Sequence, residues 1–458
     1  MKKIFMAYPK VLSPLFLTAI IFLLFSCNAP VEKNPGVQHP EWLKDATLYE
    51  VNIRQFTPEG TFNAFTEHLE KLKEMGVDII WLMPINPIGE KNRKGLLGSY
   101  YSVKDYYGVN PEFGTMDDFK AMVTKAHNTG LKVIIDWVPN HSSWDNALTI
   151  EHPEYYMKDS TGNFKPLFDW TDVIQFDYEQ PGLRQYMIDA LKFWISETDI
   201  DGFRFDVAHM IPVSFWNEVR PALYGVKEVF MLAESDQPVL NKEAFDATYD
   251  WKLHHIMNQV AQGKMDVKNI DMHFAYVDTA YPPNSILMEF TSNHDENSWN
   301  GTEYERLGDA VKTFAVFSYT IPGMPLIYNG QEVCMKKRLR FFERDTIDWI
   351  ECEMREFYTV LNNLKADNEA LYAGAEGGEM IRVIGNEPDR VFAFIRETGR
   401  NKLFVVLNFS SESIGFIAGD DQIQGLYTDV FNGELLNLSG EDTIELEGWG
   451  YKVYLSEE

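Results

Sequence analysis

Short apolar segments alternate with segments of helical periodicity from Thr47 onward, and this alternation strongly restricts the folds that the chain can adopt. Residues 48–54 predict a strand, and residues 77–83 predict a second, nearly continuous apolar strand. Between them, apolar residues recur at helical spacing over residues 62–75. Strands that are apolar on both faces are typical of parallel sheets, because helices cover both sides of such a sheet.

The next unit repeats the same order. Thr115 with Asp118 forms a capping-box pattern at the start of a predicted helix, and Gly130 supplies a typical helix end. Residues 131–138 then predict a third apolar strand. Strand, helix and strand in this order indicate a parallel sheet covered by helices.

Eight strands are predicted in total, with helices between most of them, and this number and length are typical of a (β/α)₈ TIM barrel. The predicted strands span residues 48–54, 77–83, 131–138, 200–206, 229–233, 247–251, 285–291 and 325–329.

Two regions depart from the alternation. Residues 139–178 form a long insertion after the third strand, and a connection of this length indicates a small inserted domain. Residues 367–458 contain short alternating segments separated by Gly, Asn and Asp, which predict a C-terminal antiparallel β-sandwich domain. The barrel itself is expected to span residues 41–366.

The N-terminal residues are predicted to direct export. Residues 1–26 combine a basic start with an apolar run that is short for a membrane span, as in a signal peptide. The following Cys27 resembles the lipidated cysteine of bacterial lipoproteins, and residues 27–40 are typical of a tether. We therefore expect a lipid-anchored protein in the periplasm or on the cell surface; the alternative is an ordinary secretory signal with a coincidental Cys27.

Charge and cysteine content exclude several classes of function. A formal net charge of −28 argues against nucleic acid or an anionic membrane surface as a partner, and leaves neutral substrates open. Cys334 and Cys352 are too few for a disulfide framework or a zinc cluster. We expect them to be ordinary thiols, although their spacing permits a disulfide in an oxidising compartment.

The segment 200–209 carries the first candidate for chemistry. Arg204 and Asp206 are two residues apart on a short predicted strand, so their side chains point to the same side. A neighbouring guanidinium orients a carboxylate and favours its ionised form, as a carboxylate nucleophile requires. A structural ion pair at a strand end is the alternative.

Polar side chains gather at the ends of four predicted strands. The third strand ends in Asp136-Trp-Val-Pro-Asn-His141, and the seventh in Asn293-His294-Asp295. The C-terminal ends of barrel strands form one face, where active sites lie. Three carboxylates are therefore expected to converge on that face, and a pair of carboxylates flanking the scissile bond is the minimum for sugar hydrolysis. The three are Asp206, Glu234 and Asp295.

These four strand ends resemble the four signature regions of the α-amylase family, glycoside hydrolase family 13, over most of the chain from about Trp42. The resemblance implies that Asp206 is the nucleophile, Glu234 the general acid/base and Asp295 the stabiliser of the transition state. It also implies a set of substrate-binding residues, with Tyr101 stacked under the sugar at the cleavage site, Arg204 orienting Asp206 and Asp136 supporting that end of the barrel. The set is Tyr101, Asp136, His141, Arg204, His209 and His294.

One departure from the family pattern concerns calcium. Gln175 stands where the family often has an Asp that binds a structural calcium ion, and a neutral amide weakens a site for a hard cation. Asn140 and the carbonyl of Met210 remain as possible ligands by the resemblance. We therefore expect that no cofactor is required and that calcium, if bound, is bound weakly.

The main hypothesis is a retaining hydrolase that cleaves α-1,4-glucosidic bonds of starch, glycogen or maltodextrins. A 4-α-glucanotransferase, or an exo-acting α-glucosidase or neopullulanase-type enzyme, is the alternative with the same chemistry. A catalytically silent glycan-binding lipoprotein is disfavoured, because a binding protein has no need of a nucleophile and an acid. The sequence does not fix the oligomeric state.

Overall fold

Eight parallel strands close into a barrel in the computed structural model, which describes residues 35–399 and 401–457. The order around the barrel is β1-β10-β9-β8-β7-β6-β3-β2, and pairing of Leu48 with Leu326 joins the first strand to the last. The predicted (β/α)₈ barrel is confirmed. Its strands are β1 (Leu48–Val51), β2 (Ile79–Leu82), β3 (Lys132–Trp137), β6 (Gly202–Phe205), β7 (Phe230–Ala233), β8 (Ala247–Tyr249), β9 (Ile286–Phe290) and β10 (Met324–Tyr328).

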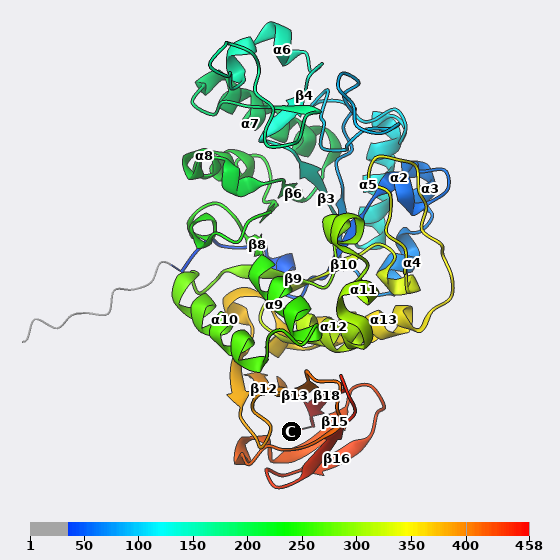
Figure 1. The fold of residues 1–458 in the computed structure, drawn as a ribbon, viewed down its shortest axis with the longest axis vertical. Coiled ribbons are helices and arrows are strands. Elements are labelled where there is room, and N and C mark those ends of the chain that lie inside the picture. The colour runs from blue at the N-terminus through cyan, green and yellow to red at the C-terminus, as the bar shows by residue number, and fades with distance from the viewer. Residues whose placement is uncertain (1–34, 400, 458) are drawn as a thin grey trace, which may run out of the picture. The chain divides into compact units, whose positions relative to one another are not determined.

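Helices surround the barrel strands (Figure 1). Strands such as β2 are buried on both faces, which explains why they are continuously apolar in sequence. The helices are α2 (Ile53–Phe56), α3 (Phe62–Thr66), α4 (Leu69–Glu74), α5 (Met116–Thr129), α7 (Pro181–Thr198), α8 (Val213–Tyr224), α9 (Trp251–Ala261), α10 (Val267–Ala280), α11 (Glu303–Leu307), α12 (Val311–Thr320) and α13 (Glu353–Asp367).

Helix α5 shows how local sequence sets the limits of an element. The Thr115 side chain accepts a hydrogen bond from the Asp118 backbone N–H, and Asp118 Oδ2 accepts one from the Thr115 N–H. At the other end Gly130 adopts a left-handed conformation with φ of 86°, which closes the helix. Both predicted ends of this helix are confirmed.

The insertion after β3 is a small domain with its own short sheet. Strand β4 (His141–Ser143) pairs with β5 (Val173–Gln175) in antiparallel register, and α6 (Leu148–Glu151) lies between them in sequence. This pairing places His141 opposite Gln175. The insertion therefore rises directly from the C-terminal end of a barrel strand.

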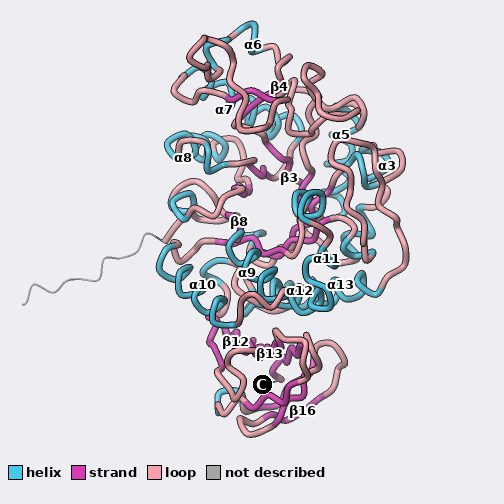
Figure 2. The backbone as a smooth tube through the Cα atoms, viewed as in Figure 1, coloured by secondary structure: helices cyan, strands magenta, loops and turns pink. Residues whose placement is uncertain are grey.

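The C-terminal domain consists of antiparallel strands, as predicted, in a six-stranded sheet β11-β12-β13-β18-β15-β16 and a two-stranded sheet β14-β17. It lies beside α12 (Figure 2). Phe314 of α12 stacks on Phe409, and Phe317 contacts Phe392 edge to face. Its strands are β11 (Glu379–Val383), β12 (Val391–Thr398), β13 (Asn401–Asn408), β14 (Ile414–Ile417), β15 (Gly425–Asp429), β16 (Leu435–Leu438), β17 (Thr443–Leu446) and β18 (Tyr451–Ser456).

The predicted signal peptide and Cys27 lie outside the described residues. From Pro35 onward, however, the expected tether is held against the barrel, because the Pro35 carbonyl accepts a hydrogen bond from Asn284 N at 3.0 Å and the Gln38 carbonyl accepts one from Arg220 Nη2 at 2.7 Å. Residues 35–40 are therefore not a free tether, contrary to expectation. None of the helices in the described part of the chain has the length and apolar content needed to span a bilayer.

Candidate active site

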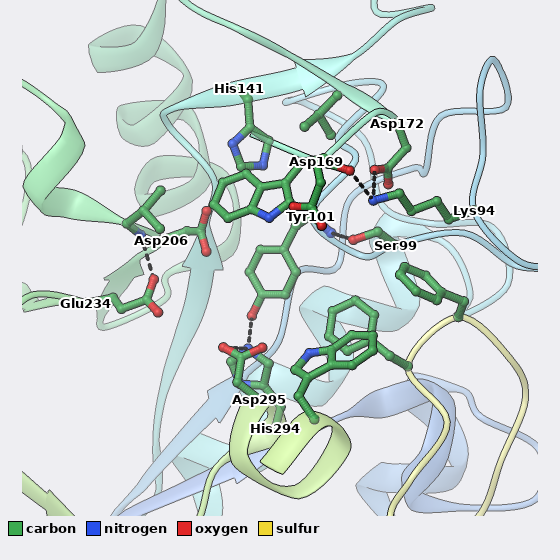
Figure 3. A pocket seen from close by; sticks show the side chains of 16 residues that line it. Lys94, Ser99, Tyr101, His141, Asp169, Asp172, Asp206, Glu234, His294 and Asp295 are labelled. Atoms are coloured by element: carbon green, nitrogen blue, oxygen red, sulfur yellow. Dashed lines mark hydrogen bonds and ion pairs between the residues drawn. The ribbon is translucent and has the colours of Figure 1, made fainter. Parts of the chain in front are cut away.

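A cavity of about 540 Å³ opens at the C-terminal ends of the barrel strands (Figure 3). The side chains of β6, β7 and the segment after β9 reach it from different strands, because successive parallel strands end on the same face. Six of the residues singled out by the sequence line the cavity: Tyr101, His141, Asp206, Glu234, His294 and Asp295.

Arg204 of β6 lies directly behind this cavity and is fully buried. Its Nη1 is 2.9 Å from Asp136 Oδ1 and 3.2 Å from Asp206 Oδ1, and its Nη2 is 3.0 Å from Glu234 Oε2. Its Nε donates to the Tyr249 hydroxyl at 3.1 Å. One guanidinium is therefore shared by carboxylates from β3, β6 and β7, which fixes their relative positions.

This sharing changes the electrostatics expected from the sequence. Burial is the largest influence on Asp206 and raises its pKa well above the ordinary value; the negative charge of Glu234 raises it further, while Arg204 opposes both. The prediction that Arg204 keeps Asp206 ionised considered one pair only. In the structure two further carboxylates also contact Arg204, and burial together with the negative charge of Glu234 raises the pKa of Asp206 despite Arg204.

The start and end of β6 explain how these groups come so close. At Gly202 a Cβ atom would lie 2.2 Å from the Phe230 carbonyl oxygen, so only glycine allows β6 to approach β7 this closely. At the other end Val207 has a φ of 38°, a strained conformation for a β-branched residue. The turn directs the Val207 N–H to Glu234 Oε2 at 2.6 Å.

His294 lines the cavity and lies between two acidic side chains. Its Nδ1 lies 2.5 Å from Glu50 Oε1, and its Nε2 lies 3.2 Å from Asp295 Oδ2. Burial lowers the pKa of His294, but Asp295 and Glu50 outweigh burial and raise that pKa to about 9. The ring is therefore an imidazolium at neutral pH.

The charged His294 ring fixes the position of Tyr101. With both ring nitrogens protonated, Nε2 donates to the Tyr101 hydroxyl at 2.7 Å, and that hydroxyl donates to Asp136 Oδ2 at 3.0 Å. The Tyr101 ring is also nearly parallel to the rings of His294 and Phe341. Burial raises the pKa of Asp136 to about 6, with Arg204 and His294 opposing the shift.

His141 lines the opposite side of the cavity as a neutral ring. Burial lowers its pKa to about 4. Its ring contacts Trp170 edge to face, and its Nδ1 lies 3.2 Å from Asn140 Nδ2. Because Nδ1 accepts from the Asn140 amide, the neutral ring carries its proton on Nε2 and offers that N–H as a donor to a polar ligand.

The remaining predicted substrate-binding residues do not line the cavity. Asp136 and Arg204 are fully buried behind it, so they position Asp206 and Tyr101 rather than contact a ligand. His209 is exposed in the turn Ala208–Met210 and lies outside the lining.

The possible calcium ligands do not form an evident cation site. Among the described residues no group of three or more His, Cys, Asp and Glu side chains is placed to hold a metal ion. Asn140 supplies an amide and Met210 a carbonyl, while Gln175 lies on β5 without the charge of a carboxylate. Hard cations such as calcium require several oxygen ligands, and this donor set does not fit one.

Several residues of the cavity wall were missed by the sequence analysis, because they lie on loops, or for Trp299 on the short helical segment Glu296–Asn300, without a recognisable pattern. They are Lys94, Trp170, Asp172, Trp299, Phe341 and Phe342. Phe341 and Phe342 lie on the loop 335–351, whose two ends are joined by a disulfide between Cys334 and Cys352. The expectation that these cysteines are ordinary thiols was therefore wrong.

Comparison with known families gives matches over nearly the whole described chain. Residues 39–165 and 154–371 match the description "Alpha amylase, catalytic domain", and residues 383–456 match "Alpha amylase, C-terminal all-beta domain". The first match covers the barrel with its insertion, and the second covers most of the C-terminal strands.

Individual relatives agree with these matches. The α-amylase MalA of Haloarcula japonica is 28% identical over 421 residues, which are 88% of this chain and 60% of MalA. The maltogenic α-amylase of Bacillus acidopullulyticus is 26% identical, covering 91% of this chain and 78% of that enzyme. The structure of a maltogenic α-amylase, AmyB of Thermotoga neapolitana, is 31% identical with a TM-score of 0.83, covering 91% of this chain and 99% of AmyB.

The pKa of His294 leads to a prediction about stability. A pKa raised from 6.5 to about 9 in the folded state stabilises the fold fully below pH 6.5, and this contribution is lost as the pH rises toward 9. The free energy of unfolding of the wild type relative to His294→Gln should therefore shrink by up to about 3 kcal/mol over this range. Chemical denaturation at a series of pH values measures it. His255→Gln, at an exposed position on α9, is the control, and a difference independent of pH would contradict a charged His294.

Proposed function

This chain belongs to the α-amylase family of glycoside hydrolases, and from that premise we propose that it hydrolyses α-1,4-glucosidic bonds of starch, glycogen or maltodextrins with retention of the anomeric configuration. The observation that carries the proposal is the pairing of Asp206 and Glu234 on one buried guanidinium at the edge of the cavity. Two carboxylates that share Arg204 are near neighbours. This favours the separation of about 5–5.5 Å that retention requires over the longer spacing of inverting enzymes.

In the first step Asp206 forms a bond to the anomeric carbon while the glycosidic bond breaks. Arg204 holds Oδ1 of Asp206, so we assign Oδ2 to the attack. Glu234 gives its proton to the departing oxygen, and Asp295 stabilises the positive charge that develops on the sugar. In the second step Glu234 takes a proton from water, and the resulting hydroxide displaces Asp206 from the sugar.

The electrostatics of the site support this division of roles. The negative charge of Glu234 raises the pKa of Asp206. When Glu234 carries the proton, its charge no longer opposes ionisation of Asp206. Arg204 then favours the ionised nucleophile, and the acid and the nucleophile are both in the required state.

Other specificities use the same site. A 4-α-glucanotransferase differs from a hydrolase only in the acceptor of the second step. A neopullulanase-type enzyme is supported about equally by the relatives, which include cyclomaltodextrinases, and an exo-acting α-glucosidase is a further alternative. A silent glycan-binding protein is disfavoured by the intact acidic groups in the cavity. Product analysis with maltooligosaccharides and pullulan distinguishes these possibilities.

We predict that Asp206→Asn abolishes turnover while the fold and some glucan binding are retained, because an amide has nearly the same size but is a poor nucleophile. Glu234→Gln should regain part of its activity with α-glucosyl fluoride, whose leaving group needs no protonation. Asp189→Asn, at an exposed position on α7, is the matched control and should behave as the wild type. A β-anomer as the first product by NMR would contradict both roles.

We further propose that the enzyme requires no cofactor and that calcium is dispensable, since Gln175 replaces a carboxylate. A chelator should leave the activity and the melting temperature nearly unchanged. The control is the chelator-treated enzyme after calcium has been added back. Rapid inactivation by the chelator, reversed by calcium, would disprove the proposal.

The lipoprotein assignment also remains a proposal, supported by the apolar run before Cys27. We predict that the mature protein is anchored by lipid on Cys27 and faces the periplasm or the cell exterior. Cys27→Ala should move the protein to the soluble fraction, whereas Cys334→Ala should not, because Cys334 lies in the barrel domain. A Cys27→Ala protein that stays with the membrane would instead indicate an uncleaved apolar anchor.

A further inference from the structure

Lys94 connects two loops that are far apart in sequence at the wall of the cavity. Its Nζ donates to the Asp169 carbonyl at 3.0 Å and lies 3.3 Å from Asp172 Oδ1. Lys94 belongs to the loop 86–100 after β2, whereas both partners belong to the insertion after β3. All three residues line the cavity, so this bridge is part of its wall (Figure 3).

The same loop is also bonded on its other side. Leu97 N donates to the Phe342 carbonyl at 3.1 Å, and Leu96 N donates to Glu343 Oε1 at 3.1 Å. These partners lie on the disulfide-closed loop 335–351. The insertion, the loop 86–100 and the loop 335–351 therefore form one continuous hydrogen-bonded wall.

The C-terminal part of the loop 86–100, which is its base, is bound to a buried side chain of the barrel. Arg54, which is fully buried, donates through Nη1 to the Gly98 carbonyl at 3.2 Å and through Nη2 to the Leu97 carbonyl at 3.4 Å. Its guanidinium also lies over the Tyr100 ring at 4.2 Å. The base is thus fixed to the barrel. The outer part of the loop meets the insertion through Lys94 at the cavity wall, and through Glu90 N with Asp145 and Lys91 with Trp144 outside the cavity lining.

This wall lies at one particular end of the cavity. Glu234 and Lys94 lie on opposite sides of Tyr101 (Figure 3). A general acid stands on the side of the leaving group, so the side of Lys94 receives the sugar that is transferred to the nucleophile and any units on its non-reducing side. Trp299, Phe341 and Phe342 line the cavity too, and aromatic faces of this kind pack against sugar rings.

We propose that Lys94 is a specificity-determining positioning residue, whose bridge to Asp169 and Asp172 closes the non-reducing end of the cavity. The enzyme then binds α-glucan chains by their non-reducing ends and releases short products. This inference rests on the proposed function and on the assignment of Glu234 as the acid. In this inference the contacts between loops, and not the acidic groups, cause the exo-action.

The burial of the bridge makes it sensitive to substitution. The side chain of Asp172 is only 5% exposed, and Lys94 is its ion-pair partner. Loss of one partner leaves a buried charge uncompensated, which costs more than the intact pair contributes. Replacement of Lys94 should therefore drive Asp172 toward water and separate the loop 86–100 from the insertion at the cavity wall.

The test uses the full-length enzyme with Lys94→Met and Asp172→Asn, each of which removes the ion pair while keeping the side-chain size similar. Lys268→Met makes the same chemical change at an exposed ion pair with Asp389, outside the cavity lining and away from the insertion, and is the matched control. The substrates are maltoheptaose and maltoheptaose with a bulky acetal cap on its non-reducing glucose. The quantity measured is the ratio of the cleavage rate of the capped chain to that of the free chain, which does not depend on the fraction of folded enzyme.

We expect the wild type and Lys268→Met to reject the capped chain and to release short products from the free chain. Both bridge variants should raise the capped-to-free ratio by about tenfold, which corresponds to about 1.4 kcal/mol of discrimination. Efficient cleavage of the capped chain by the wild type would overturn the inference and leave the hydrolase proposal intact. A change in Lys94→Met without one in Asp172→Asn would also overturn it, since Lys94 would then act by touching the sugar directly. A wild type that cleaves no α-glucan would overturn the proposed function and this inference with it.

Discussion

The arrangement of the active site depends on one buried cation shared by three carboxylates. Arg204 contacts Asp136, Asp206 and Glu234, which come from three neighbouring strands. Arg204 and Asp136 are fully buried and Asp206 and Glu234 are nearly so, so water screens their charges little and each carboxylate is held where the guanidinium can reach it. The geometry of the site follows from this constraint: groups from separate strands converge because a single planar donor set must serve them all.

The same constraint leaves the cavity rich in negative charge. His294 is the second cation of the network, between Glu50 and Asp295, so five carboxyl groups are joined to two positive side chains. This excess of carboxyl groups over cations favours retention of a proton on one carboxyl group. The excess negative charge also stabilises a positively charged centre in the cavity, such as the oxocarbenium-like transition state of glycoside hydrolysis. The charge balance thus suits an acid and a nucleophile acting in turn.

The sequence was informative wherever structure is set locally or by strand order. The barrel followed from apolar strands alternating with helices, and α5 followed from the capping pattern at Thr115 and the glycine after its last turn. Convergence of Asp206, Glu234 and Asp295 followed from their places at strand ends. The contacts of Arg204 with several carboxylates could not be predicted from the sequence. A pair of residues close in sequence does not reveal which other strands supply charges across the barrel.

The other features that the sequence did not predict are the loop contacts that form the cavity wall. The wall of the cavity is made by contacts between segments far apart in the chain, such as Lys94 with the insertion and Leu97 with Phe342. Neither segment carries a periodic pattern, and their meeting depends on how the barrel places the ends of β2, β3 and β10. Strand ends therefore set the reaction that this fold can perform, whereas long-range loop contacts set which part of a chain can reach it. This division explains why the type of chemistry could be inferred from residues close in sequence, while the shape of the substrate site required the structure.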